Sequence, residues 1–193
     1  TLDALNTHTI RNIENIIGTS HNDSIAGDTG NNTLIGGAGT DTIRAIAGNN
    51  VIYGDSTDYG LNVTTNNDVT YAGTGEDKIY AGGGADTIFT AAGSDTVYGG
   101  DGNDLIYAGN GGRIFGGDYI VASQSHVDSG EDTVSYELIT SSVTVRLDAN
   151  FAIVAATGNS DIIFGVENVI GTSFADSIVG TNSINNTLIG GAG

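Results

Sequence analysis

Cysteine, proline, methionine and tryptophan are all absent from this chain of 193 residues. Without cysteine the chain forms no disulfide and carries no thiol for catalysis or metal binding. Without proline it is neither collagen-like nor a proline-rich disordered segment, although glycine is abundant at 31 residues.

Basic residues are scarce: 5 Lys and Arg stand against 23 Asp and Glu, which gives a net charge of -18. Binding to nucleic acid or to an anionic membrane surface needs clusters of Lys and Arg, so neither is expected. No apolar run approaches the roughly 20 residues that span a bilayer, so membrane insertion is not expected either. An acidic excess of this size expands a chain by self-repulsion unless cations neutralise it.

What the sequence does contain is a nine-residue repeat in one unbroken phase. From Gly18 to Tyr107 the chain divides into ten consecutive nonapeptides, of which GGAGTDTIR (36–44) and GGDGNDLIY (99–107) are clear examples. Seven of the ten sixth places are Asp, and nine of the ten eighth places are aliphatic. The sixth places hold Asp23, Asn32, Asp41, Asn50, Tyr59, Asp68, Asp77, Asp86, Asp95 and Asp104.

Each nonapeptide predicts a glycine-rich turn followed by a short strand. Glycine at the first, second and fourth places supplies backbone conformations that other residues resist. The last three residues alternate out, in, out, so only the eighth place points inward. Two units make one coil with a strand on each side, and stacked 18-residue coils form two parallel sheets around a thin aliphatic core. The expected fold class is all-β, a parallel β-roll (a β-helix solenoid).

The repeat resembles a known family. The nonapeptide at 99–107 matches the RTX pattern G-G-x-G-x-D-x-U-x, with U a large aliphatic residue, at every defined place. Strict matches cover 27–44 and 72–107, and looser ones cover 18–26, 45–53, 158–164 and 171–193. The resemblance implies that calcium lies between each turn and the turn two units later. Aspartates and backbone carbonyls of both turns would hold it.

Calcium also fits the turns on chemical grounds. It is a hard cation that takes six to eight oxygen ligands, and carboxylates stacked about 5 Å apart repel unless a cation lies between them. Ordinary solvated turn-forming Asp residues are the alternative, but such residues have no reason to recur every nine positions. The expected metal-binding residues are Asp23, Asp41, Asp68, Asp77, Asp86, Asp95, Asp104, Asp132, Asp161, Asp176, Asn32, Asn50, Gly36, Ala72, Gly82, Gly99 and Gly102.

Successive turns alternate between the two edges of the roll, so every second sixth place is expected to share an edge. One edge would carry Asp23, Asp41, Tyr59, Asp77 and Asp95, and the other Asn32, Asn50, Asp68, Asp86 and Asp104. The expected sites pair Asp77 with Asp95, Asp86 with Asp104, Asp68 with Asp86, and Asp23 with Asp41. Asn32 and Asn50 offer weaker, neutral ligands. Tyr59 is expected to interrupt its series, and Arg113, at a sixth place, to cap the roll.

Two segments depart from the repeat. Residues 54–71 keep the spacing but lack the glycines, so they either continue the roll or form a surface loop. Residues 117–157 break the phase, with Asp132 one residue out of register, and are expected to form an irregular excursion packed on the roll. The expected division is a strand and cap at 1–17, the main roll at 18–116, and resumed repeats at 158–193. Glu14 and Glu167 are either additional ligands or half-exposed acids on a strand.

The two ends of the chain repeat each other. IENIIGTS at 13–20 reappears as VENVIGTS at 166–173, an offset of 153 residues, and NNTLIGGAG at 31–39 recurs at 185–193. Together with the missing initial Met, this repetition leads us to expect a segment of a longer array of tandem modules, with the next module starting within 158–193.

Aromatic side chains fill many ninth places, which are expected to point outward. One face would carry Ile35, Tyr53, Tyr71, Phe89 and Tyr107, and the other Arg44, Asn62, Tyr80 and Tyr98. Such a stripe indicates self-association or polysaccharide binding. The alternatives are stacking that stiffens the sheet and cover by the excursion. Ice binding is disfavoured, because the outward seventh places mix Thr with Val51, Lys78 and Leu105.

No pattern in the sequence resembles a catalytic site. His8, His21 and His126 are scattered, and no Ser–His–Asp arrangement, zinc-binding helix motif or phosphate loop is present. The sequence therefore predicts a non-enzymatic calcium-binding structural module. The RTX resemblance implies export by type I secretion, and so an extracellular or bacterial cell-surface location in an adhesin, surface-layer or filament-forming protein. The alternatives are the non-catalytic RTX part of a secreted enzyme or toxin and a polysaccharide-binding module.

Overall fold

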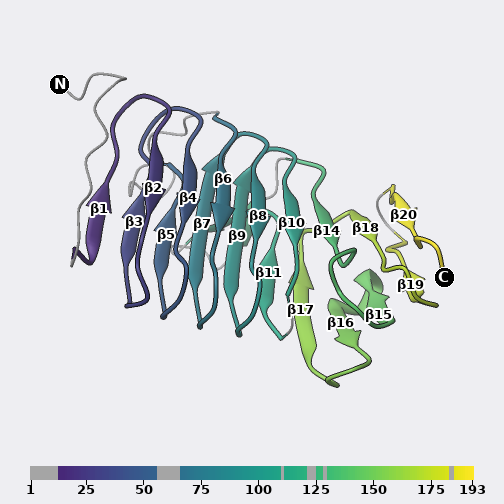
Figure 1. The fold of residues 1–193 in the computed structure, drawn as a ribbon. Helices are drawn as coiled ribbons and strands as arrows, with labels where there is room; N and C mark the ends of the chain where they lie inside the picture. The colour runs from purple at the N-terminus through teal and green to yellow at the C-terminus, as the bar shows by residue number, and fades with distance from the viewer. Residues whose placement is uncertain (1–12, 56–65, 110, 121–124, 128–129, 183–184) are drawn as a thin grey trace.

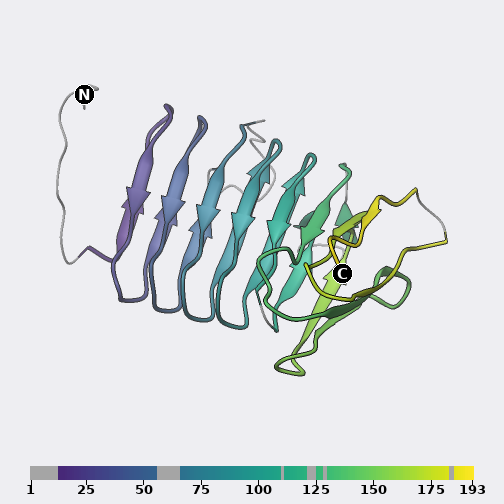
Figure 2. The ribbon, with the colours of Figure 1, turned by 45° about the vertical axis from the view of Figure 1, so that its right-hand side comes forward.

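The computed structural model describes residues 13–55, 66–109, 111–120, 125–127, 130–182 and 185–193. Its chain winds as a stack of coils, with strands on two opposite faces and turns at two opposite edges (Figures 1 and 2). Apart from one 3-10 turn, η1 (Leu147–Ala149), the described residues hold strands, turns and loops. The predicted all-β class and parallel β-roll are confirmed. Within the described ranges there is no helix long and apolar enough to cross a membrane.

The strands form two large sheets and one separate hairpin. Sheet A has the order β1 (Asn15–Ile17), β3 (Thr33–Ile35), β5 (Val51–Tyr53), β7 (Lys78–Gly83), β9 (Thr96–Asp101), β11 (Arg113–Phe115), β17 (Ser160–Phe164), β16 (Phe151–Val154), β15 (Val143–Arg146), β19 (Ser177–Val179). Sheet B has the order β2 (Ser24–Ala26), β4 (Thr42–Arg44), β6 (Val69–Tyr71), β8 (Thr87–Phe89), β10 (Leu105–Tyr107), β14 (Thr133–Ser135), β18 (Asn168–Ile170), β20 (Leu188–Ile189). The hairpin pairs β12 (Asp118–Ile120) with β13 (Ser125–Val127).

The eighth place of each repeat forms the core, as the period of two along a strand requires. Leu34, Ile52 and Ile79 on sheet A are fully buried, and so are Ile43, Ile88 and Ile106 on sheet B. Each of these six strands contributes one such side chain to the space between the sheets, so the core of the repeats is one aliphatic layer per sheet. A core this thin is stable only as a stack of many coils, and the turns must add to it.

The segment 54–71 contributes one half-coil rather than two. β4 pairs with β6, and the first sixth-place hydrogen bond between these coils joins residues 27 apart instead of 18. Gly54 and Asp55 begin a turn that Asn66, Asn67 and Asp68 complete, and the ten residues 56–65 between them, which include Tyr59, lie outside the described residues. Strand pairing therefore passes over one repeat length between β5 and β6. An insertion of one repeat length leaves the sequence phase intact, so the sequence could not reveal it.

This insertion exchanges the faces of all later repeats, so the predicted faces are wrong beyond Asp55. Tyr53 stacks on Tyr80, not on Tyr71, and sheet A carries one continuous series of stacked rings. The centroid distances along Tyr53, Tyr80, Tyr98, Phe115 and Phe164 are 5.1, 5.1, 4.9 and 5.6 Å. On sheet B, Tyr71, Phe89 and Tyr107 stack at 4.7 and 4.4 Å.

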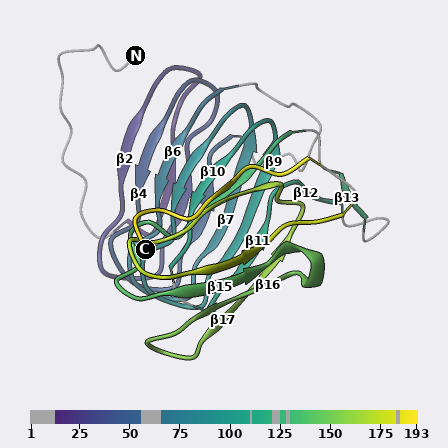
Figure 3. The same ribbon diagram turned by 90° about the vertical axis from the view of Figure 1, so that its right-hand side faces the viewer.

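The segment 117–157, expected as an excursion, supplies three strands to the sheets. β14 lies in sheet B between β10 and β18, with Ile106 opposite Val134. β16 runs antiparallel between β15 and β17 in sheet A, and Figure 3, with the C-terminal end toward the viewer, shows these strands there. Only the hairpin β12–β13 stands apart from both sheets, and it contacts β9. Asp132 is thus in structural register with the roll although the loop before it shifts the sequence phase.

Candidate metal sites in the turns

The sixth-place side chains form two series along the roll, one at each edge. The turns that lead into sheet B form the first edge, and those that lead into sheet A form the second. At the first edge the series is Asp23, Asp41, Asp68, Asp86, Asp104 and Asp132. At the second edge it is Asn32, Asn50, Asp77 and Asp95. The expected neighbours Asp23–Asp41, Asp68–Asp86, Asp86–Asp104 and Asp77–Asp95 do lie on adjacent coils. The predicted interruption by Tyr59 is wrong, because Asp41 is followed directly by Asp68.

One hydrogen bond links each sixth place to the next. The backbone N–H of each residue donates to Oδ1 of the side chain one coil further on, at 2.7 Å for Asp68 to Asp86 and 2.9 Å for Asp86 to Asp104. This bond holds every carboxylate in one orientation and withdraws it from solvent: Asp41 is 0 % and Asp86 2 % exposed. The most polar side chains of the repeat are therefore buried inside the turns.

The second oxygen of several of these carboxylates lacks a hydrogen-bonding partner. Oδ2 of Asp41, Asp68, Asp77 and Asp86 is buried and accepts no hydrogen bond from any residue that the structure describes. Burial of a charged oxygen without a partner is strongly unfavourable, and folded proteins avoid it unless a cation or a donor compensates. The turns thus present oxygen atoms that need a cation.

Burial also raises the pKa of these carboxyl groups. Loss of water around the charged form raises the pKa of Asp86 to about 8 and the pKa of Asp68 to about 7, and neighbouring carboxylates add to both rises. The pKa of Asp95, at the second edge, rises to about 7 for the same first cause, and those of Asp41 and Asp77 are also raised. At neutral pH the charged series is therefore destabilising unless positive charge enters it.

Backbone carbonyls face the same spaces as the Oδ2 atoms. A Cβ added to Gly36 would collide with Oδ2 of Asp41 and with the carbonyl oxygen of Gly54 in the next coil. The same pair of contacts recurs at Gly99, with Oδ2 of Asp104 and the carbonyl oxygen of Gly116. Glycine at the first place therefore leaves room where a carboxylate and a carbonyl of adjacent coils converge.

The donor set fits calcium. Within the described ranges no three His, Cys, Asp or Glu side chains gather at one point, so carbonyl oxygens must complete any site. Calcium accepts such a mixture of carboxylate and carbonyl oxygens in a flexible geometry. Asp41, Asp68 and Asp86 with the neighbouring first-place carbonyls would hold the ions of the first edge.

The other predicted backbone positions shape the turns. Gly82, at a second place, has φ +117°, and Gly102, at a fourth place, has φ +128°, conformations that side chains resist. A Cβ on Gly102 would also strike the carbonyl of Gly84 in the coil below. Ala72 holds a first place of the second edge, where its N–H donates to the carbonyl of Phe89 at 3.0 Å.

The second edge is built differently at its start. The side-chain nitrogen of Asn50 donates to the carbonyl oxygens of Ala47 and Gly48 at 3.2 and 2.9 Å and to Oδ1 of Asp77 at 2.9 Å. The Asn50 amide nitrogen is thus surrounded by two carbonyl oxygens and one carboxylate oxygen, which are the ligands that a calcium ion would take. The turn also has a non-glycine residue, Ile46, at φ +82°, which is strained for a β-branched side chain. The Asn32–Asn50 part of this edge thus satisfies its oxygens without metal.

We expect Asn50→Asp to create an additional calcium site. The substitution removes the internal N–H donors and puts a carboxylate against Oδ1 of Asp77 and two carbonyls, so a cation must replace the lost donors. The variant should bind one more calcium ion per chain in equilibrium dialysis and melt at a lower temperature than the parent when calcium is withheld. Asn49→Asp, which adds the same charge at the neighbouring fifth place, serves as the control. Equal calcium stoichiometry in all three proteins would contradict the prediction.

The end of the second edge differs from the expectation for Arg113. That residue pairs with Thr96 and begins β11, so it holds a seventh place and the sixth place belongs to Gly112. The predicted capping role at a sixth place is therefore wrong, and a one-residue deletion in the turn is the reason. Gly111 and Gly112 donate to Oδ1 of Asp161, both at 2.7 Å, and the Tyr136 hydroxyl donates to its Oδ2 at 2.9 Å. Protein donors thus reach both oxygens of Asp161, unlike those of Asp41, Asp68 and Asp86.

Three further acids take part in the turns. Glu167, 5 % exposed, accepts the N–H of Asp132 at 2.9 Å and so extends the first-edge series past its last Asp. Asp176 accepts the N–H of Thr172 at 2.6 Å and that of Val143 at 2.8 Å. Asp55, which sequence reasoning missed, is buried beside the first edge and accepts the N–H of Gly83 at 2.9 Å. No sequence signal marks Asp55, because it stands at a second place normally held by glycine.

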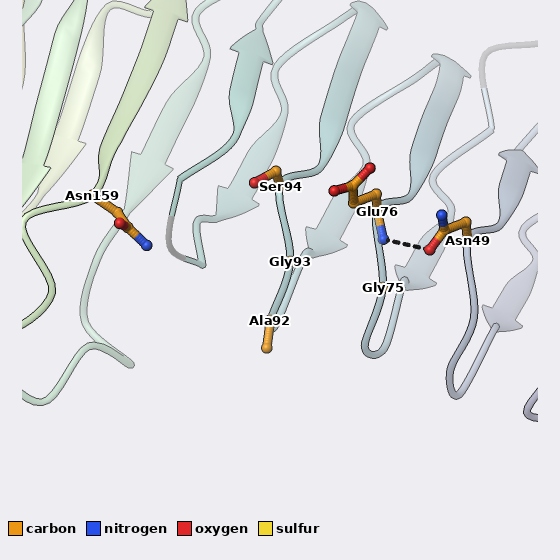
Figure 4. A pocket seen from close by; sticks show the side chains of 7 residues that line it. All are labelled: Asn49, Gly75, Glu76, Ala92, Gly93, Ser94 and Asn159. Atoms are coloured by element: carbon orange, nitrogen blue, oxygen red, sulfur yellow. Dashed lines mark hydrogen bonds between the residues drawn. The ribbon is translucent and has the colours of Figure 1, made fainter.

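The fifth place carries a second hydrogen-bonding series that sequence reasoning also missed. Oδ1 of Asn49 accepts the N–H of Glu76 in the next coil at 3.0 Å (Figure 4). Asn22, Asn31, Asn67 and Asn103 accept equivalent bonds from Thr40, Asn49, Ala85 and Glu131. The recurrence of Asn at fifth places was the available signal. These amides fix the outer side of each turn while the sixth place supplies the inner carboxylates.

Comparison with known families agrees with this geometry. Residues 17–52, 63–97 and 80–114 match the family model described as the RTX calcium-binding nonapeptide repeat (4 copies). The matched residues include the first-edge acids from Asp23 to Asp104, and the match is interrupted at 53–62. A comparison with curated proteins gave no match.

Proposed function

Because this chain belongs to the RTX calcium-binding nonapeptide repeat family, over residues 17–114, we propose that it is a calcium-stiffened structural module of a secreted bacterial surface protein. Repeats of this family bind calcium, and proteins that carry them are typically secreted by bacteria. An adhesin, a surface-layer protein or a filament-forming protein is the parent that we propose. The role of the module is to hold its neighbours apart and to transmit force along the roll axis.

The observation that carries the proposal is the row of buried carboxylate oxygens at the first edge. Oδ2 of Asp41, Asp68 and Asp86 is buried at successive coils, and backbone carbonyls converge with Oδ2 of Asp41 and Asp68. In the calcium-free chain these acids, together with the net charge of -18, oppose winding. Calcium removes that opposition at each coil, so binding and folding occur together.

Coupling of this kind suits an exported protein. Extracellular calcium modules bind with dissociation constants of about 10⁻⁴–10⁻³ M, far above cytosolic calcium. We expect the chain to stay expanded inside the cell and to wind only after export. Folding by calcium also explains how a chain with a thin aliphatic core is stable, because ion binding adds free energy of folding that hydrophobic burial alone does not provide.

The aromatic stripes favour stiffening over polysaccharide binding. Sugars bind by laying their apolar face on an exposed ring face, whereas the rings of Tyr53, Tyr80 and Tyr98 lie nearly parallel at 5.1 Å with planes within 9°. Neighbouring rings therefore cover one another's faces. Tyr98 and Phe115 are further buried, at 9 % and 5 % exposure. Stacking along the roll axis adds resistance to bending and separation of coils.

The second candidate is the calcium-binding part of a secreted enzyme or toxin, since the same repeats serve there as a non-catalytic domain. The similarity of 13–39 to 166–193 favours a tandem array instead. A tandem array repeats the first residues of its module, whereas a single appended domain has no need for a second copy of them. A catalytic domain in the flanking sequence of the parent would decide for the enzyme or toxin.

A calcium titration tests the proposed function. At about 37 °C and neutral pH the chain freed of metal is expected to lie above its melting temperature, and there it should gain its β-sheet circular dichroism with a midpoint of about 10⁻⁴–10⁻³ M calcium. The gain should be steep, because several sites fill together. Magnesium at equal concentration should not replace it, since magnesium demands a rigid octahedral site and retains its water. A spectrum that is fully folded without metal, or equally restored by magnesium, would overturn the proposal.

A further inference from the structure

The first and last coils of the molecule are two versions of one element. We call residues 13–39 the head and residues 166–193 the tail; they share IENIIGTS/VENVIGTS and NNTLIGGAG. β1 pairs in parallel with β3 in the head, and β18 pairs in parallel with β20 in the tail. The N–H of Gly18 donates to Ile35 at 2.8 Å, and the N–H of Gly171 donates to Ile189 at 2.7 Å. The two segments are thus alike in conformation as well as in sequence.

The tail is seated on a defined surface, the strands β14 and β15. β18 continues sheet B beside β14, with Val169 opposite Val134, and β19 continues sheet A beside β15, with Ile178 opposite Val145. Two carboxylates fix the tail there. Glu167 accepts the N–H of Asp132 at 2.9 Å, and Asp176 accepts the N–H of Val143 at 2.8 Å.

The head has the same groups but presents them to solvent. Glu14 is exposed where Glu167 is 5 % exposed, and Thr19 is exposed where Thr172 is 1 % exposed. Ile13 is 44 % exposed, whereas its counterpart Val166 is 4 % exposed. β1 and β2 are the terminal strands of sheets A and B among the described residues. The head is therefore a tail-like element that no strand among the described residues receives.

We propose that the head of one copy docks on β14 and β15 of a preceding copy, in the place that the tail takes here. Copies of this module then join end to end as one continuous roll, as separate chains or as tandem repeats of one parent. The occupant is a second copy because the tail, which shares most of the pairing residues and both carboxylates with the head, already shows the fit. The interface depends on strand pairing and not on which ion fills the turns, so it stands apart from the proposed function.

The tail supplies the register of this junction. Asn15 lies opposite Thr133, Ile16 opposite Val134 and Ser24 opposite Thr144, by the pairing of their counterparts Asn168, Val169 and Ser177. The Glu14 carboxylate accepts the N–H of Asp132 of the preceding copy, and Oδ1 of Asp23 accepts that of Val143. Both open edges of the head are covered at once.

The junction also turns each copy relative to the last. β1 and β3 belong to sheet A, but their counterparts β18 and β20 belong to sheet B. Sheet A of each copy therefore continues sheet B of the copy before it, a rotation of about half a turn around the roll axis. The long aromatic stripe of sheet A therefore alternates sides along the array.

Sedimentation velocity of full-length variants in calcium tests the junction. Val169→Asp with Ile178→Asp loosens the tail and frees β14 and β15, so this variant should form dimers and longer chains as its concentration rises. Adding Ile16→Asp and Ile25→Asp, which spoil the head, should return it to a monomer. Circular dichroism checks that each variant winds in calcium. A wound tail variant that stays monomeric, or oligomers that persist when the head is also spoiled, would overturn the proposal.

Cysteine cross-linking provides a second measurement, made in the variant that carries Val169→Asp and Ile178→Asp, because an intact tail covers Thr133 by pairing with it. The chain has no cysteine, so Asn15→Cys and Thr133→Cys introduce the only pair. Mild oxidation should yield disulfide-linked chains on a non-reducing gel, whereas the out-of-register pair Ile13→Cys and Thr133→Cys should yield at least about tenfold fewer, because cross-linking needs Cα atoms within about 7 Å. Equal yields would refute the register. Failure of both variants to wind in calcium would count against the proposed function instead.

Discussion

Without calcium, the roll should be most stable in acid and should lose stability as the pH rises toward 8. The pKa of Asp86 is about 8 and those of Asp68 and Asp95 about 7 in the folded chain, against 3.8 for the free group. The folded state thus holds protons that the unfolded state has released. Their contribution to stability is complete below pH 3.8, falls between the two values, and is lost above about pH 8.

Calcium should reverse this dependence, because it binds only the deprotonated carboxylates. The difference between the melting temperatures with and without calcium is expected to be small near pH 4 and largest above about pH 8, and calcium binding near pH 7 should release protons. Calorimetric melting across this range, with metal removed on a chelating resin because EGTA weakens in acid, measures it. Sodium chloride at equal ionic strength controls for screening of surface charge. A calcium-free melting temperature that rises from pH 4 to 8 would contradict the assignment.

Asp86→Asn should change the sign of its effect with calcium. Among the described residues, the buried Asp86 carboxylate accepts one hydrogen bond, from the N–H of Asp68 to Oδ1. In calcium-free protein above about pH 8 the substitution removes this buried charge, so the variant is expected to be more stable than the parent. In calcium it removes a charged ligand from the middle of the first edge and disturbs the spaces on both sides. There the calcium midpoint of folding should rise at least about tenfold.

Asn32→Ala is the matched control for this test, because Asn32 holds a sixth place and is equally buried at 2 % but lies in the neutral part of the second edge. It should lower stability modestly and by the same amount with and without calcium, since it loses the hydrogen bond that the Asn32 side-chain amide donates to Oδ1 of Asp28. Paired calcium titrations and calcium-free melts of both variants give the comparison. Equal shifts of the calcium midpoint in Asp86→Asn and Asn32→Ala would refute a special role for the first-edge carboxylates.

Local chemistry made much of this fold predictable. Ile79 and Ile106 are core residues because a nonapeptide strand has one inward position, and Gly82 and Gly102 take positive φ because the turn demands it. The adjacency of Asp68 and Asp86 followed from counting two units along the chain. Each of these features depends on residues within one or two repeats, which is the distance over which the sequence pattern is unambiguous.

Features that depend on the number of half-coils were not predictable in this way. The N–H of Asp41 donates to Asp68 instead of facing Tyr59, because strand pairing passes over one repeat length there. The nine-residue phase of the sequence is unchanged by this. Asp132 joins the first edge across 28 residues, and Arg113 leaves its expected place by a one-residue deletion. Insertions and deletions in turns become visible only in the strand pairing, because the same repeat spacing is compatible with more than one arrangement of coils.

By itself, therefore, the sequence determined the repeating unit: a glycine turn, one carboxylate, one inward aliphatic side chain and an acidic charge that requires a cation. Strand pairing in the folded chain sets which carboxylates are neighbours, which oxygens the Asn50 side chain binds, and that the tail covers β14 and β15. The physical reason is that the unit is fixed by short-range sterics and burial. The order of units in space is fixed by strand pairing between residues 18, 27 or 28 positions apart.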